Sequence, residues 1–304
     1  MTAGSFLEVE IASQPACWRR ALGGLDRWRE ALPRPGERVA VVGCGTSWFM
    51  AQAYAALRER AGLGLTDAFT ASETPSGRRY DRLVAITRSG TTTEVLEALA
   101  ALRGRCPTVA ITAAPASPVQ QVADDSVVLG FADEHAVVQT RFATTTLALL
   151  RAHLGQDLTA PLAEAEQALA ADLPPGALRR TQFTFLGRGW SVGLANEAAL
   201  KLREAARAWA ESYPAMEYRH GPVSISGADS VVWFLGAPPQ GLADEAARTG
   251  ALVVAEPRDP MAELVRVQRL AAALALAKGL DPDNPRHLAR SVVLQSGTTS
   301  RQVP

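Results

Sequence analysis

The chain has 304 residues, 47% of them hydrophobic, which is enough for one large domain or two of ordinary size. Lys plus Arg and Asp plus Glu number 31 each, a balance that argues against binding to nucleic acid or to an anionic membrane surface. The three cysteines share no CxxC or metal-type spacing, which argues against a disulfide framework and a zinc site and favours a reducing cytoplasm.

The first residues lack the basic start and apolar run of an export signal, and no apolar run of the sequence reaches membrane-spanning length. We therefore expect neither export nor membrane insertion. We also expect no metal and no cofactor.

Apolar strands and helices alternate in the first half of the chain. Apolar residues at steps of three or four predict a helix over residues 15–32. Continuous apolar runs predict strands at 38–42, 67–71, 82–87, 108–112 and 126–129, with helices that end near residues 60, 102 and 154. Such alternation is typical of a doubly wound parallel sheet covered on both faces.

The same scheme begins again after a connecting helix over 160–171 and the linker Leu173-Pro174-Pro175-Gly176. A strand at 183–186 runs into a glycine turn and a helix to about residue 209, followed by strands at 230–235 and 251–255 and a helix over 261–278. The sequence therefore predicts an α/β protein with two tandem doubly wound halves, residues 1–172 and 173–304.

The first glycine turn, Gly43-Cys44-Gly45-Thr46-Ser47, follows a strand and opens a helix. It resembles a dinucleotide-binding fingerprint, but Trp48 stands where that fingerprint needs its last glycine. An indole there would obstruct the close approach of helix and strand. Taken alone, this turn is better interpreted as a tight connection that needs no ligand.

The second turn, Thr87 to Thr93, places five hydroxyls around Gly90 at a helix start, where free backbone N–H groups favour an anion. Hydroxyl donors with few lysines suit a phosphate monoester. The alternative is helix capping, for which one Ser or Thr would suffice. The GxxxxGK[ST] lysine is absent from the sequence, so nucleoside triphosphate hydrolysis is not expected.

Glu197, Lys201 and Glu204 are spaced by four and then three residues, which puts them on one face of the predicted helix. His220 follows in a His-Gly-Pro turn. An acid, a base and an ammonium suit proton transfer on a small anionic substrate. The alternatives are an exposed helix face with i,i+4 ion pairs and a structural histidine.

Taken together, these motifs resemble the sugar isomerase (SIS) domain family. The likeness is greatest to the tandem isomerase half of glucosamine-6-phosphate synthase and to related sugar-phosphate deaminases and deglycases. It covers nearly the whole chain and rests on five motifs in order: Gly43-Cys44-Gly45-Thr46-Ser47, Thr87-Arg88-Ser89-Gly90-Thr91-Thr92, Leu186-Gly187-Arg188-Gly189, Glu197-x3-Lys201-x2-Glu204 and His220-Gly-Pro. The resemblance implies two flavodoxin-like SIS halves.

The resemblance also implies roles for individual residues. The acid matching Glu204 removes the C2 proton of the sugar, Glu197 and Lys201 line the same site, and the histidine matching His220 assists ring opening from a second subunit. A homodimer is therefore implied. The residues implied to bind the sugar or its phosphate are Cys44, Gly45, Thr46, Ser47, Thr87, Arg88, Ser89, Thr92, Val137 and Ala289.

The sequence departs from the family pattern at three places. No glutaminase half precedes the SIS part and Thr2, not cysteine, follows Met1, so we do not expect a complete synthase. Arg290 occupies the place of a lysine that would form a Schiff base, and a guanidinium cannot serve as that nucleophile. Arg88 replaces the usual glutamine of the phosphate turn. This replacement is expected to add a permanent positive charge that strengthens phosphate binding.

The resemblance and the acid–base set together favour an enzyme that processes glucosamine 6-phosphate or N-acetylglucosamine 6-phosphate, by C2 proton abstraction that leads to aldose–ketose isomerisation or deamination. One alternative is a lyase or dehydratase that eliminates the C3 substituent, in which Arg290 would stabilise an enolate or a leaving hydroxyl. A second alternative is a sugar-phosphate sensor without catalysis.

Overall fold

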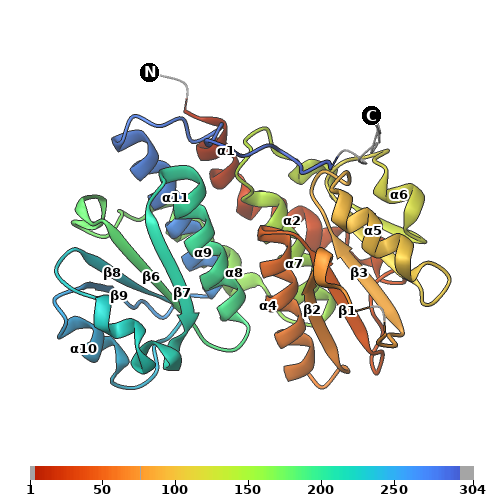
Figure 1. The fold of residues 1–304 in the computed structure, drawn as a ribbon, viewed down its shortest axis with the longest axis horizontal. Coiled ribbons are helices and arrows are strands. Elements are labelled where there is room, and N and C mark those ends of the chain that lie inside the picture. The colour runs from red at the N-terminus through yellow and green to blue at the C-terminus, as the bar shows by residue number, and fades with distance from the viewer. Residues whose placement is uncertain (1–3, 76, 295–304) are drawn as a thin grey trace, which may run out of the picture.

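The computed structural model describes residues 4–75 and 77–294; Met1 and Thr2 lie outside these ranges. It is an α/β protein with two parallel sheets (Figure 1), as predicted. The first sheet has the order β2-β1-β3-β4-β5, and every neighbouring pair is parallel. Its strands are β1 (Val39–Gly43), β2 (Thr66–Thr70), β3 (Arg82–Ile86), β4 (Thr108–Thr112) and β5 (Asp125–Val128).

The second sheet has the order β7-β6-β8-β9 and is also parallel throughout. In both sheets the first strand lies between the second and the third, so the two sheets begin with the same topology. The strands of the second sheet are β6 (Gln182–Gly187), β7 (Trp209–Pro214), β8 (Ser230–Leu235) and β9 (Leu252–Val254).

Helices connect and cover the strands. The described residues contain α4 (Thr46–Arg60), α5 (Thr93–Leu102), α6 (Val119–Val122) and α7 (Arg141–His153) around the first sheet, α8 (Thr159–Ala170) as the connection, and α9 (Ser191–Ala206), α10 (Leu242–Ala247) and α11 (Pro260–Ala277) around the second. Three short helices precede them, α1 (Phe6–Ala12), α2 (Gln14–Gly23) and α3 (Leu25–Trp28).

Two predictions of secondary structure are wrong. The single helix expected over residues 15–32 is divided into α2 and α3, because the Gly23-Gly24 pair ends the first of them. The helix expected to continue to residue 209 ends at Ala206, where Arg207 adopts a left-handed conformation with φ 48°, and Trp209 begins the unpredicted edge strand β7.

Helices α4 and α9 pack against each other at the centre of the molecule (Figure 1). Gly193 permits the close approach, since a Cβ there would lie 2.4 Å from the carbonyl oxygen of Phe49. Asn196 Nδ2 donates to Gln52 Oε1 at 2.8 Å farther along. Thr46 at the start of α4 contacts Lys201 in the carboxyl-terminal half of α9, whereas a Cβ on Gly193 near the start of α9 would also lie 2.9 Å from the backbone nitrogen of Ala53. The two helices are therefore antiparallel. Because each follows a strand of its own parallel sheet, the carboxyl ends of the two sheets point in opposite directions.

The end of the chain crosses back to the first sheet after α11 (Figure 1). The Asp283 carboxylate accepts the backbone N–H groups of Phe6 at 2.9 Å and Leu7 at 2.7 Å. The Thr93 N–H then donates to the Val292 carbonyl at 3.2 Å, beside the start of α5. Residues of the second predicted half thus lie directly on the first.

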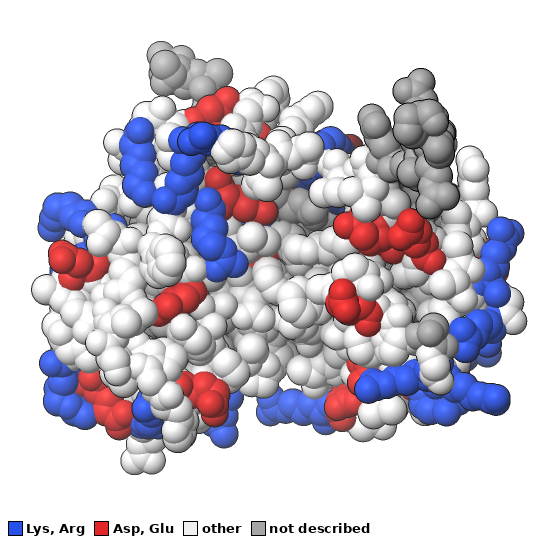
Figure 2. Space-filling model, viewed as in Figure 1, with Lys and Arg blue, Asp and Glu red and all other residues white. Residues whose placement is uncertain are grey.

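Charges of both signs are interspersed around a largely uncharged centre on the face shown in Figure 2. The described part of the chain includes no helix that is both long and apolar enough to cross a membrane.

Candidate active site

Lys201 links the first glycine turn to the acids of α9. Its Nζ atom lies 3.3 Å from Glu197 Oε1 and 2.5 Å from Glu204 Oε2, and it donates to Thr46 Oγ1 at 3.1 Å. The side chains of Lys201 and Glu197 are 1% and 0% exposed, so the alternative of a solvated ion-pair face is wrong. Residues that are 155 positions apart in the sequence are therefore joined in one buried contact.

The Lys201 ammonium forms ion pairs with both carboxyl groups of this cluster, those of Glu197 and Glu204. Burial raises the pKa of Glu197 to about 7, opposed by the positive charge of Lys201 and assisted by the negative charge of Glu204. Burial would lower the pKa of Lys201, but Glu197 and Glu204 together raise it above its ordinary value. Glu197 is therefore protonated below about pH 7, where an ordinary glutamate would be ionised, while Lys201 stays charged.

Glu204 is the member of the cluster that reaches solvent, with a side chain 19% exposed. It lines a pocket of about 420 Å³ together with Leu200, Arg203, Arg207, Arg286, His287 and Leu288. A carboxylate that is held by a buried ammonium and faces an open pocket can accept a proton from a bound molecule.

The first turn has the tight geometry that its glycines predict. A Cβ on Gly43 would lie 2.7 Å from the backbone of Ser47, and Gly45 has φ 53°. Thr46 and Ser47 are buried at the start of α4, and the Ser47 N–H donates to the Cys44 carbonyl at 3.1 Å. Cys44, Gly45, Thr46 and Ser47 thus lie together at the end of β1.

The hydroxyls of the second turn converge on a residue that the motifs did not identify, Ser291. Its Oγ accepts from Thr91 Oγ1 at 2.8 Å and Ser89 Oγ at 3.1 Å, and lies 3.4 Å from Thr92 Oγ1. Several hydroxyls that meet at one oxygen form the arrangement expected for a phosphate oxygen. Thr87 is buried behind them, with its Oγ1 accepting the Gly90 N–H at 3.3 Å.

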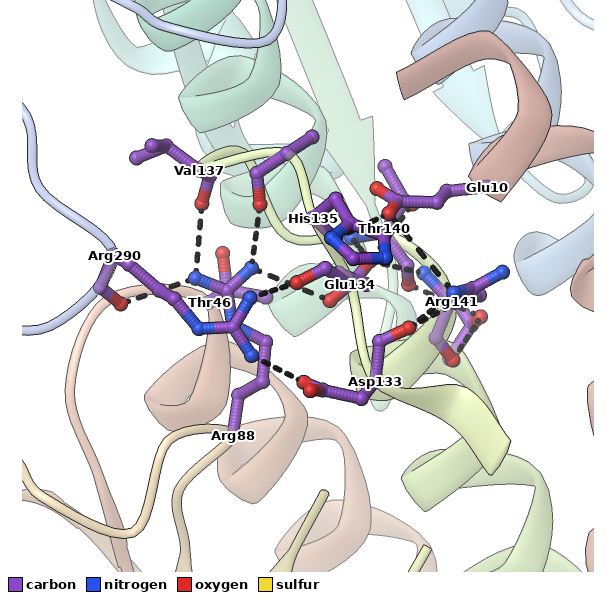
Figure 3. A network of polar contacts seen from close by, with 12 residues as sticks. Glu10, Thr46, Arg88, Asp133, Glu134, His135, Val137, Thr140, Arg141 and Arg290 are labelled. Carbon is purple, nitrogen blue, oxygen red and sulfur yellow. Dashed lines mark hydrogen bonds and ion pairs between the residues drawn. The ribbon is translucent and has the colours of Figure 1, made fainter. Parts of the chain in front are cut away.

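Arg88 is buried at the centre of a polar network behind this turn (Figure 3). Its guanidinium donates to the carbonyl oxygens of Ala136 at 3.0 Å, Val137 at 3.2 Å and Arg290 at 3.0 Å. It also forms an ion pair with Glu134 at 3.5 Å. Burial lowers the pKa of Arg88. These contacts are all with protein groups, so the expected binding of phosphate by Arg88 stays a prediction.

Glu134 extends the network to α7, and the motifs did not single it out. Its Oε1 accepts the N–H groups of Thr140 at 2.5 Å and Arg141 at 2.8 Å, which caps that helix. Arg290 pairs with Asp133 at 2.5 Å and donates to the Glu134 carbonyl (Figure 3). The buried pair of Arg88 and Glu134 thus holds together the second turn, residues 133–137 and the returning end of the chain.

The structure does not bring every predicted residue to Glu204. Val137 is half-buried beside Arg88, Ala289 is exposed on the returning segment, and His220 is exposed on a 3₁₀ turn (Ala215–His220) after β7. Within residues 4–75 and 77–294, no hydrogen bond or ion pair joins His220 to the α9 cluster or to either turn. The same residues contain no group of three or more His, Cys, Asp and Glu side chains placed to hold a metal ion.

The chain is similar to known proteins in both sequence and structure. Residues 34–154 match the family model described as SIS domain. The chain is 29% identical to a glutamine–fructose-6-phosphate aminotransferase (isomerizing) from a Nostoc species, in an alignment that covers 95% of this chain and 59% of that protein. It spans about half the length of the curated relatives it matches.

Two solved structures show the same fold. Glucosamine-6-phosphate deaminase from Thermotoga maritima is 25% identical with a TM-score of 0.78, over 95% of this chain and 100% of that one. Tagatose-6-phosphate ketose/aldose isomerase from Escherichia coli is 20% identical with a TM-score of 0.80, over 97% of this chain and 98% of that one.

The network around Arg88 predicts a large effect of Arg88→Met. The substitution leaves Glu134 buried without its ion-pair partner and three carbonyls without a donor, so the free energy of unfolding should fall by about 3–5 kcal/mol. The matched control is Arg29→Met, which removes an exposed pair with Asp26 and should cost about 0–1 kcal/mol. Urea unfolding followed by circular dichroism measures the free energy of unfolding of both variants. Equal losses in the two variants would contradict a role of Arg88 in holding these segments together.

Proposed function

The chain belongs to the sugar isomerase (SIS) domain family, and on that basis we propose that it is an enzyme acting on an amino-sugar 6-phosphate of the glucosamine 6-phosphate or N-acetylglucosamine 6-phosphate class. The proposed reaction is C2 proton abstraction followed by aldose–ketose isomerisation, with loss of ammonia from the unsubstituted amino sugar. The observation that carries the proposal is the contact of Lys201 with both Thr46 and Glu204, which joins the proposed phosphate-binding turn to the proposed general base.

The comparisons support this substrate class. The Thermotoga maritima structure is a glucosamine-6-phosphate deaminase, and the Nostoc relative is named for an isomerising aminotransfer to fructose 6-phosphate. Since the chain spans only part of such relatives, the glutamine-dependent step is not part of the proposal.

The chemistry follows from the placement of the groups. The hydroxyls of Ser47, Ser89 and Thr92 would bind the phosphate monoester, with backbone N–H groups at the starts of α4 and α5. Glu204, fixed by Lys201, would take the C2 proton and return it to C1, which converts the amino aldose into a ketose imine. Water then hydrolyses the imine to ketose phosphate and ammonia, so that atoms and charges balance. This route needs no Schiff base with the protein, which agrees with Arg290 at the lysine position.

We also propose that residues 1–172 and 173–304 are two SIS halves and that the active unit is a homodimer in which His220 serves the partner's site. Large apolar side chains that are exposed in the sequence around His220 support an interface. Trp209 on the edge strand β7 is 74% exposed, Met216 47% and Ile225 53%, which is unusual for large apolar side chains on one short stretch of a monomer.

Substitution of the proposed base tests the function. Glu204→Gln should lower turnover of glucosamine 6-phosphate about 10²–10⁴-fold while sugar-phosphate binding stays within a few-fold, because only the proton acceptor is lost. The matched control is Glu97→Gln, an exposed acid on α5. Ammonia release and fructose 6-phosphate formation measure turnover, and calorimetry measures binding.

Three outcomes of that assay would overturn the proposal. Full turnover in Glu204→Gln would show that the base is wrong. An unsaturated product seen by ultraviolet absorbance, without ammonia, would indicate elimination. Binding without any turnover in the wild-type chain would indicate a sensor.

Subunit mixing tests the shared site. Glu204→Gln and His220→Ala proteins should each be inactive, whereas a mixture that exchanges subunits should recover about a quarter of wild-type turnover. Half of the dimers are then mixed, and each mixed dimer has one intact site of two. Two differently tagged proteins verify the exchange. Exchange without recovered turnover would contradict a site completed by the partner's His220.

A further inference from the structure

The glycine turn of the second half repeats the geometry of the first. Gly187-Arg188-Gly189-Trp190-Ser191 has the spacing of Gly43 to Ser47, and a Cβ on Gly187 would lie 2.3 Å from the Ser191 carbonyl oxygen. Gly189 has φ 57° and Gly45 has φ 53°. The first turn is covered by Lys201, but the second opens onto a pocket that has no part in the proposed reaction.

This pocket has a volume of about 760 Å³ and lies at the carboxyl ends of the second sheet. It is lined by the turn after β6, by residues 235–237 at the end of β8 and by residues 257–260 at the start of α11. In open parallel sheets, ligands bind outside the carboxyl ends of the strands where the strand order reverses, which here is between β6 and β8.

Helix α4 separates the pocket from the candidate active site. Thr46 at its first residue contacts Lys201, whereas Arg60 at its last residue lines the pocket. Fourteen helical steps of 1.5 Å place these residues about 21 Å apart. The two sites are therefore distinct.

The pocket has an excess of positive charge. Its acids are engaged: Asp259 pairs with Arg151 at 2.8 Å, and Glu164 accepts the Asp259 N–H. Arg60 and Arg188 are exposed and line the pocket, and in the described part of the chain neither forms an ion pair. Two free guanidinium groups beside engaged acids favour an anionic ligand, and guanidinium geometry matches phosphate.

Trp190 adds an aromatic surface to the same wall. It is half-buried and lines the pocket, and the Arg151 guanidinium lies 4.7 Å from its ring centroid. Because Arg151 is also paired with Asp259, the indole is held in place. A rigid aromatic ring next to free arginines suits a ligand with a ring and a phosphate.

We propose that this pocket, defined by Arg60, Arg188 and Trp190, is a second binding site that takes a phosphate ester whose ring packs on Trp190. Its volume is in the range of pockets that hold nucleotide-sized molecules. The ring could be that of a nucleoside or of a sugar, which the experiment distinguishes.

Calorimetry on the full chain tests this site, with uridine 5′-monophosphate, glucose 6-phosphate and inorganic phosphate as probes. At least one of the two esters should bind more tightly than inorganic phosphate, and Arg60→Gln/Arg188→Gln should weaken that binding about tenfold or more, because two charged hydrogen-bond donors are lost. The matched control is Arg103→Gln/Arg248→Gln, two exposed arginines that do not line the pocket, and its dissociation constant should be unchanged.

The outcomes distinguish binding at this pocket from binding at the candidate active site. Turnover of glucosamine 6-phosphate should survive in Arg60→Gln/Arg188→Gln, so failure of the second site would not affect the proposed reaction. Ester binding that is unchanged in this variant but lost in Ser89→Ala/Thr92→Ala would overturn the proposal. Failure of both esters to bind, or binding no tighter than that of inorganic phosphate, would also overturn it. Thermal unfolding verifies that each variant is folded.

Discussion

The arrangement of the site depends on one buried ammonium. Lys201 lies on α9 of the second half, yet one of its three contacts is with Thr46 at the start of α4 in the first half. A buried charge costs several kcal/mol unless it is paired and hydrogen-bonded, so this contact constrains how α4 and α9 can pack. The close approach at Gly193 satisfies that constraint, and it brings the glycine turn after β1 beside the acid that faces the pocket.

A second buried cation, Arg88, is likewise stabilised by an ion pair and by hydrogen bonds. Arg88 lies behind the hydroxyl turn and binds three carbonyl oxygens and Glu134, which belong to two other segments of the chain, residues 134–137 and the returning end at Arg290. It thereby holds the returning segment where Ser291 can meet the hydroxyls of Ser89 and Thr91. The Arg88 guanidinium thus has a structural role that an exposed charge on a loop would not have.

Much of the fold follows from local patterns in the sequence. Continuous apolar runs predict eight of the strands, and the spacing of Glu197, Lys201 and Glu204 places them on one face of α9. The edge strand β7 is missed because Glu211 and Ser212 interrupt its apolar run, and edge strands need no continuous apolar sequence. The division of the first helix depends on a glycine pair whose cost is small and context-dependent.

The site is less predictable because its partners are distant in the sequence. Periodicity gives the face of a helix but not what covers it, so it could not distinguish the buried Lys201 cluster from a solvated ion-pair face. Ser291 and Glu134 belong to no motif, and they become parts of the site only because tertiary contacts bring them to Ser89 and Arg88. His220 is exposed in the single chain, and its proposed role depends on a partner subunit.

The central claim is that burial raises the pKa of Glu197, and that one ammonium shared between Glu197 and Glu204 does not offset this, so that Glu197 keeps a proton which an ordinary glutamate would lose. Carbon-13 NMR of the glutamate carboxyl groups, with Glu197 assigned by the loss of its signal in Glu197→Gln, tests this claim most directly. The account predicts a Glu197 pKa of about 7, with the carboxyl protonated below that pH and ionised above it. A Glu197 signal that titrates near the ordinary glutamate value, about 4.3, would contradict the account.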